Sequence, residues 1–190
     1  MKKLLLFIAY VFITCSVSAQ VTVPKFRSNS SDNPFTTIKN YDLLIACRAY
    51  DNVAHSITFN AMVLKNEHWH KLTYKQNVSS APLSVTEPPF KEAAATDAQC
   101  QSVYNTLVAD KLFSVDDDSN LPKCNESTEK VDGTEQKVSH STEDGSEYRI
   151  WLITPSKTRY LYYYAPEFFA AYCPDNKARK EVVKIVGLLK

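Results

Sequence analysis

Glycine is scarce in this chain, with only three among its 190 residues. Two of them, Gly133 and Gly145, lie in an acidic stretch, and Gly187 lies near the C-terminal end of the sequence. A phosphate-binding loop needs closely spaced glycines so that the backbone can approach the ligand. The sequence therefore argues against nucleotide binding of the P-loop or dinucleotide-binding type.

Other short catalytic motifs are missing as well. The sequence has no His-Glu-x-x-His pair of the kind found in zinc proteases and no Gly-x-Ser-x-Gly turn of the kind found in α/β hydrolases. It also lacks a Cys-x-x-Cys pair, which disfavours a thioredoxin-like redox site and a zinc knuckle. Catalytic residues can be scattered along a chain, so the question of an enzyme stays open. The interpretation that we favour is a non-enzymatic protein without a cofactor.

Charge is nearly balanced, with 22 lysines and arginines against 21 aspartates and glutamates. Proteins that bind nucleic acid through its phosphates usually carry a basic surplus, so we expect no nucleic-acid partner. The one long apolar run, residues 4–13, lies at the N-terminal end and is short for a membrane span. We therefore expect no transmembrane segment in the mature chain.

Residues 1–19 have the pattern of a secretory signal peptide. Two lysines precede the apolar run, and the small residues of the sequence VSA precede Gln20. We expect cleavage after Ala19 and export of the mature protein to the periplasm or the extracellular space. A lipoprotein signal at Cys15 is the alternative, although Thr14 is a poor fit for the residue before a lipidated cysteine.

Four cysteines remain after removal of this segment: Cys47, Cys100, Cys124 and Cys173. An even number in an exported chain favours disulfides, and four cysteines allow three connectivities. We favour a Cys100–Cys124 disulfide, because the acidic stretch can fold back onto the start of the preceding helix. Cys47 and Cys173 would then pair or stay reduced, and Cys47, in an apolar strand, has the alternative of being a buried free thiol.

Hydrophobic periodicity predicts an antiparallel sheet with two helices. Residues 20–40 are polar and interrupted by prolines, so we expect a flexible N-terminal arm ahead of a single domain at residues 41–190. Three strands follow as a meander, and a helix begins at Thr96, where Gln99 completes a capping-box pattern. A hairpin and a last helix complete the order βββ-α-ββ-α, which defines an α+β fold. The predicted strands cover residues 41–50, 55–65, 68–76, 147–154 and 159–164.

Residues 116–147 differ in composition from the rest of the chain. They contain ten acidic and three basic residues and very few apolar ones. Such a segment buries too little apolar surface to offset the entropy lost on ordering. We therefore expect a flexible acidic loop between the helix and the hairpin.

Two histidines, His68 and His70, are two residues apart and therefore point to the same side of a predicted strand. This spacing suits two imidazole ligands of one zinc or copper ion. No third ligand is evident nearby, so an exposed strand end beside a turn is the interpretation we prefer.

The hairpin near the C-terminal end places aromatic side chains on alternate faces. An even connection around the sequence PSKT pairs Trp151 with Tyr162 and directs Leu161 and Tyr163 toward the helices. The opposite face then carries a row of residue types that are common in binding hot spots. This row consists of Arg149, Trp151, Tyr160, Tyr162 and Tyr164.

The row could support the sheet through cross-strand contacts, bind a partner, or do both. We interpret the protein as a small exported binding or inhibitor-like module that presents this aromatic sheet face to a protein or glycan. The alternatives are a metal-dependent enzyme that uses His68 and His70, and a structural accessory subunit of an envelope assembly.

Overall fold

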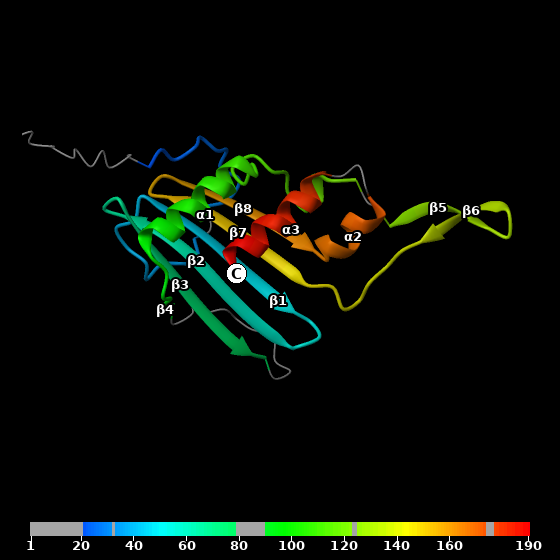
Figure 1. Cartoon of the computed structure of the whole chain (residues 1–190), viewed down its shortest axis with the longest axis horizontal. Coiled ribbons are helices and arrows are strands. Elements are labelled where there is room, and N and C mark those ends of the chain that lie inside the picture. Colours follow the sequence, from blue (N-terminus) through cyan, green and yellow to red (C-terminus); the bar gives the residue numbers. More distant parts are fainter. Residues whose placement is uncertain (1–20, 32, 79–89, 123–124, 174–176) are drawn as a thin grey trace, which may run out of the picture.

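A computed structural model of the chain describes residues 21–31, 33–78, 90–122, 125–173 and 177–190, and it has the expected α+β architecture (Figure 1). The expected signal peptide lies outside these residues. Six antiparallel strands form the main sheet in the order β4-β3-β2-β1-β7-β8, and β5 and β6 form a separate hairpin. The strands are β1 (Leu43–Asp51), β2 (Ser56–Lys65), β3 (His68–Asn77), β4 (Lys91–Glu92), β5 (Glu126–Val131), β6 (Thr134–Ser139), β7 (Glu147–Thr154) and β8 (Lys157–Tyr164). The helices are α1 (Asp97–Ala109), the short 3-10 helix η1 (Asp118–Asn120), α2 (Pro166–Tyr172) and α3 (Lys177–Leu189).

The long helices α1 and α3 cover one face of the main sheet (Figure 1). Alternate residues of β1, such as Leu43 and Ile45, point to this face and are fully buried. Tyr104 of α1 and Ile185 of α3 belong to the same apolar cluster. The predicted meander, hairpin and helices therefore pack in the layered arrangement that the sequence indicates.

The capping box predicted for α1 is present. Thr96 Oγ1 accepts a hydrogen bond from the Gln99 backbone N–H, and the Gln99 side chain accepts one from the Thr96 N–H. These bonds satisfy N–H groups that have no partner within the helix. The buried stripe of α3 contains Val182 and Ile185, and also Arg179.

The N-terminal arm begins on the helix side of the sheet. Phe26 is buried against Phe113, with 5.9 Å between the ring centroids. The hydroxyl of Tyr104 donates a hydrogen bond to the carbonyl oxygen of Thr22. This part of the arm is thus attached to α1 and to the segment that follows it.

The arm continues to the opposite face of the sheet, where a second apolar cluster lies. Phe35 is fully buried and meets Trp151 edge-on, with 5.4 Å between the ring centroids. Ile38 and Tyr41 pack against the same cluster. Phe26 and Phe35 thus anchor an otherwise polar segment on both faces of the sheet, and the flexibility that we expected of the arm stays a prediction.

The edge of β8 is occupied by side chains. The Asn29 side chain donates a hydrogen bond to the carbonyl oxygen of Tyr160 and accepts one from the Tyr160 N–H, at 2.8 and 2.7 Å. The Tyr162 N–H donates to Asp117 Oδ2 at 2.7 Å. Unpaired groups on an edge strand invite pairing with another chain, and these contacts satisfy several of them.

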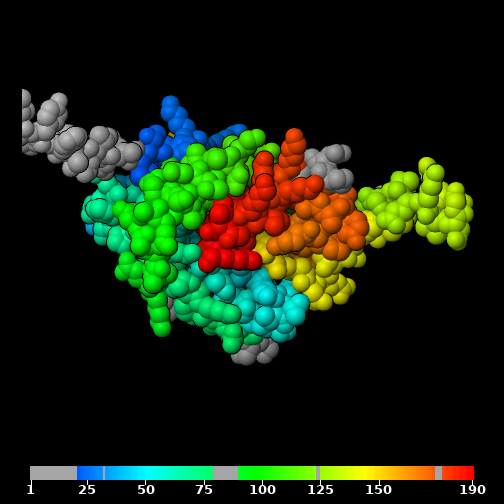
Figure 2. Space-filling model, in the orientation of Figure 1, coloured from blue at the N-terminus to red at the C-terminus, as the bar shows by residue number. Residues whose placement is uncertain are grey.

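The acidic stretch contains regular structure that was not expected. β5 and β6 form a hairpin that projects beyond the rest of the molecule (Figures 1 and 2), and its residues are mostly exposed. Asp132 and Gly133 have positive φ angles of 52° and 81°, as a two-residue hairpin turn requires. Asp132-Gly133 is the sequence signal for this turn, and the prediction, which rested on composition, did not use it. The flexibility of this segment stays a prediction.

The predicted Cys100–Cys124 disulfide is contradicted, because Cys47 and Cys100 are both buried free thiols. Cys100 lies on the face of α1 that packs against the sheet, where its thiol is enclosed in the core. Cys124 lies outside the described residues, and Cys173 is not among the free thiols.

Candidate functional site

The alternation predicted for the C-terminal hairpin is confirmed. Leu161 and Tyr163 are fully buried on the helix side, and the aromatic row occupies the other face. The predicted pairing is shifted by two residues, because Trp151 lies opposite Tyr160 rather than Tyr162. The cause is a two-residue turn at 155–156, since a shift of two residues changes the partners but keeps every side chain on its face.

The five residues of the predicted row differ in accessibility. Trp151 is only 7% exposed, because it lies beneath Phe35 and beside Tyr160. Tyr162 and Tyr164, nearer the C-terminal end of β8, remain half-buried. Tyr160 and Arg149 are half-buried as well, so Trp151 is the member of the row that is closed to solvent.

Arg149 belongs to a charged group beside Tyr162. Its guanidinium carbon lies 5.9 Å from the centre of the Tyr162 ring, and its Nε donates to Glu147 Oε1 at 2.7 Å. Arg48, which is 9% exposed, donates to the same oxygen at 2.7 Å. The pKa of the Tyr162 hydroxyl is raised by burial and then by the nearby Glu147 carboxylate. Arg149 is thus held in place beside Tyr162 rather than left as a free surface cation.

Tyr162 and Tyr164 line a cavity of about 390 Å³, which we call the aromatic pocket. The end of β8, η1 and the segment after it, α2 and α3 all contribute to its wall. Its lining residues are Asp118, Ser119, Leu121, Asn125, Tyr162, Tyr164, Phe169 and Arg179.

Buried polar contacts hold the wall of the aromatic pocket. Arg179 is 4% exposed, and its Nε donates to Asp118 Oδ1 at 2.9 Å. A second nitrogen of the same guanidinium donates to the carbonyl oxygen of Pro122 at 3.1 Å. The guanidinium carbon also lies 5.6 Å from the centre of the Phe169 ring. One arginine therefore links α3, α2 and the η1 segment, and these contacts fix the shape of the pocket before any ligand binds.

Sequence reasoning found two members of this pocket and missed the others. Tyr162 and Tyr164 were predicted as binding residues, whereas Asp118 was assigned to the acidic loop and Phe169 was not singled out. Arg179 gave the one usable signal, because an arginine within an apolar helical stripe needs a buried partner. The partner could not be identified from the sequence, because Asp118 is 61 residues earlier.

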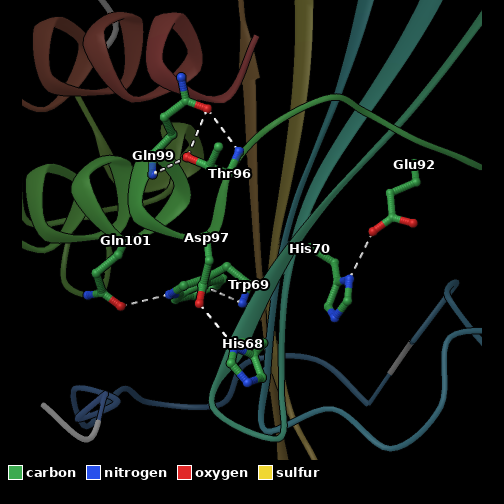
Figure 3. Close-up of polar contacts among 8 residues, drawn as sticks. All are labelled: His68, Trp69, His70, Glu92, Thr96, Asp97, Gln99 and Gln101. Atoms are coloured by element: carbon green, nitrogen blue, oxygen red, sulfur yellow. Dashed lines mark hydrogen bonds and ion pairs between the residues drawn. The ribbon is translucent and has the colours of Figure 1, made fainter. Parts of the chain in front are cut away.

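His68 and His70 line a different cavity, of about 550 Å³, on the other side of the molecule; we call it the histidine cleft. Its lining residues are Ile38, Lys39, Val63, Lys65, Asn66, His68, His70, Leu72 and Glu92. His68 Nδ1 lies 3.1 Å from Asp97 Oδ2, and His70 Nδ1 lies 2.9 Å from Glu92 Oε1 (Figure 3). The structure thus gives each imidazole a carboxylate partner that the sequence analysis did not identify.

Asp97, the first residue of α1, is fixed by two bonds. Its Oδ1 accepts a hydrogen bond from the Trp69 N–H at 2.8 Å, and its Oδ2 faces His68 (Figure 3). These two bonds, the backbone one first, lower the pKa of the Asp97 carboxyl. Trp69 Nε1 in turn donates to Gln101 Oε1 at 2.8 Å. The start of β3 is therefore fastened to the start of α1.

Comparisons of the chain with protein-family models, with curated proteins and with solved structures found no match. The described helices include none with the length and apolarity to cross a bilayer. The described ranges also hold no cluster of three or more histidine, cysteine, aspartate or glutamate side chains arranged to bind a metal ion.

Proposed function

We propose that this protein is an exported, non-enzymatic binding module whose ligand site is the aromatic pocket, and that the ligand is a sugar unit of a glycan. The observation that supports this most directly is the pocket itself, where Tyr162, Tyr164 and Phe169 meet polar side chains in one concavity. Its volume of about 390 Å³ lies within the range usual for small-ligand sites.

The chemistry of the lining favours a sugar over an extended protein surface. Aromatic rings offer flat apolar faces that suit the C–H faces of a pyranose, and Tyr hydroxyls keep a polar tip. Ser119 and Asn125 add groups that can exchange hydrogen bonds with sugar hydroxyls. The pocket is concave and of limited size, whereas a protein interface usually buries about 800 Å² on each partner.

The charges of the pocket support binding rather than hydrolysis. Glycoside hydrolysis typically uses two carboxyl groups that flank the scissile bond. The described lining contains one carboxylate, that of Asp118, and it is already paired with the buried Arg179. This ion pair supports a structural role for both groups in the wall.

The test is a screen of immobilised glycans with the mature protein, followed by calorimetry with the best ligand. Tyr162→Ala and Tyr164→Ala should each weaken binding by about 2 kcal/mol, the scale of a binding hot spot. Tyr172→Ala is the matched control, because Tyr172 is a more exposed tyrosine of α2 that does not line the pocket. Failure to bind any glycan, or equal affinity of the Tyr162→Ala variant and the wild type, would overturn the proposal. Protein capture that depends on Tyr162 would instead favour the protein-partner alternative.

A further inference from the structure

His68 and His70 are placed together by the turn that joins β2 to β3. Asn66 and Glu67 have positive φ angles of 50° and 66°, and Lys65 lies opposite His68. This two-residue turn fixes the register of β3 from its first residue. Positions two residues apart in a strand are separated by about 6.6 Å, and their side chains point to the same face of the sheet. The two imidazoles therefore start from neighbouring positions and line the same cleft.

In both imidazoles a carboxylate lies at Nδ1, which leaves Nε2 as the nitrogen that could bind a metal ion. Asp97 and Glu92 lie at Nδ1 of His68 and His70, as Figure 3 shows. A neutral imidazole that donates its Nδ1 proton to a carboxylate has its lone pair on Nε2, where a metal ion can bind. Metal-binding histidines in proteins almost always have such a carboxylate, carbonyl or water partner on the outer nitrogen.

The surroundings leave room for a hydrated ion. The side chain of His68 is 72% exposed and that of His70 is 43% exposed, so an ion in the cleft can reach both rings from solvent. Lys39 and Lys65 also line the cleft, and the carboxylate of Glu92 and the adjacent Asp97 offset their charge. With two protein ligands, the remaining coordination positions would be filled by water.

We propose that His68 and His70 form a chelating pair for a divalent transition-metal ion, Cu²⁺ or Zn²⁺, with Asp97 and Glu92 orienting the two rings. Imidazole nitrogen suits both ions, and Cu²⁺ binds more tightly than Zn²⁺ to a given nitrogen site. The assignment is independent of the aromatic pocket, and each can fail without affecting the other.

The experiment is a calorimetric titration of the untagged mature protein with Cu²⁺ and, separately, with Zn²⁺. We expect binding of one ion, tighter for Cu²⁺, together with quenching of tryptophan fluorescence by Cu²⁺, since Trp69 is the residue between the two ligands in the sequence. His68→Gln and His70→Gln should each remove most of the affinity. Asp97→Asn and Glu92→Gln should weaken it by about tenfold, the usual cost of losing an orienting partner.

The matched control is His55→Gln, which removes an exposed histidine from the turn between β1 and β2. Its affinity should equal that of the wild type. All five substituted side chains are at least partly exposed, so circular dichroism should show native folds. Absence of binding to the wild type at millimolar ion, or unchanged affinity in a His68→Gln/His70→Gln double variant, would overturn the metal site.

Discussion

Tyr162 and Tyr163 are adjacent in sequence and lie in opposite environments. Tyr163 is fully buried on the helix side, and its hydroxyl donates a hydrogen bond to the carbonyl oxygen of Asp116. Tyr162 lies half-buried on the other face, between Arg149 and the aromatic pocket. Strand alternation alone separates these two residues, so it also separates their expected roles in stability and binding.

Tyr163→Ala should lower the free energy of unfolding by about 3–5 kcal/mol, because it leaves a large cavity in a closed core. Tyr162→Ala should cost about 1 kcal/mol or less, the scale of a cross-strand contact. Urea denaturation of both variants measures the difference. Equally large losses from the two substitutions would mean that Tyr162 serves the core, and they would remove the support for a binding role.

Asp97 should make the protein more stable at neutral pH than in acid. Its pKa in the folded state lies below the ordinary value of 3.8, because the Trp69 N–H and His68 favour the ionised form. A depressed carboxyl pKa adds stability above the unfolded-state pKa, and this contribution is lost as pH falls through the folded-state value.

The expected result is that Asp97→Asn destabilises the protein at pH 7 and has progressively less effect below about pH 4. Urea midpoints measured across this range provide the comparison. Asp110→Asn is a suitable control, because this aspartate follows the C-terminal end of the same helix. A constant difference between wild type and Asp97→Asn at every pH would show that the charge of Asp97 contributes nothing.

At the scale of elements, the N-terminal arm completes the fold rather than preceding it. It contributes Phe26 to the cluster under the helices and Phe35 to the cluster on the opposite face. Between them it runs along the β8 edge, where Ser30 pairs with Thr158. Both faces and one edge of the sheet therefore depend on a segment without a helix or a strand of its own.

Phe35→Ala should destabilise the protein by about 3–5 kcal/mol, as expected for loss of a fully buried aromatic ring. It should also make the arm susceptible to limited proteolysis, because Phe35 attaches the arm to the sheet face opposite the helices. Denaturation midpoints and mass spectrometry of the proteolytic fragments measure the two effects. Arg27→Ala, an exposed position in the same arm, should change neither. Resistance of the Phe35→Ala arm to cleavage would contradict this anchoring role.

At the scale of the whole molecule, the sequence was sufficient to predict the layered arrangement of sheet and helices. It was also sufficient to predict which face of the sheet most strand residues occupy. Leu161 and Tyr163 were assigned to the core from period-two alternation, and Thr96 was recognised as a helix cap from its spacing to Gln99. These features depend on short-range patterns, which is why they were predictable. The cross-strand partner of each residue in the hairpin was not predictable, because a two-residue turn and a four-residue turn give the same alternation of faces.

The features that sequence reasoning missed depend on contacts between distant segments. Phe35 is an isolated aromatic residue in a polar segment, and nothing local indicates that Trp151 lies beneath it. The aromatic pocket likewise requires Asp118 and Arg179 to meet across 61 residues. Periodicity in the sequence assigns a side chain to a face of its strand, but it does not indicate which segment covers that face.

The free thiols lead to a prediction for the other two cysteines. Burial raises the pKa of Cys47 to about 12, and it also raises the pKa of Cys100. With both held in the core, Cys124 is left to pair with Cys173. Cys124 lies outside the described residues, but Pro122 contacts Arg179, and Asn125 lines the aromatic pocket with Phe169 of α2. Cys173 directly follows α2, four residues after Phe169.

The native mature protein should therefore react very slowly with a thiol reagent at pH 8, because both thiols are buried and protonated. After unfolding without reductant, two thiols should react, and peptide mapping should recover a Cys124–Cys173 crosslink. Unfolding in reductant followed by its removal provides the control with four reactive thiols. Four reactive thiols without reductant would show that no disulfide forms.

The central position of β1 in the sheet has a consequence for the order in which the protein can fold. β1 pairs with β2, which follows it immediately, and also with β7, about a hundred residues farther along the chain. The N-terminal arm needs β7 and β8 in place before Phe35 and Asn29 can bind. Although the ribosome makes it before the domain, the arm can dock only after β7 and β8 have been made. Until the arm docks, an apolar face of the sheet stays exposed. During this interval a chaperone can bind the chain, or the chain can aggregate with another molecule.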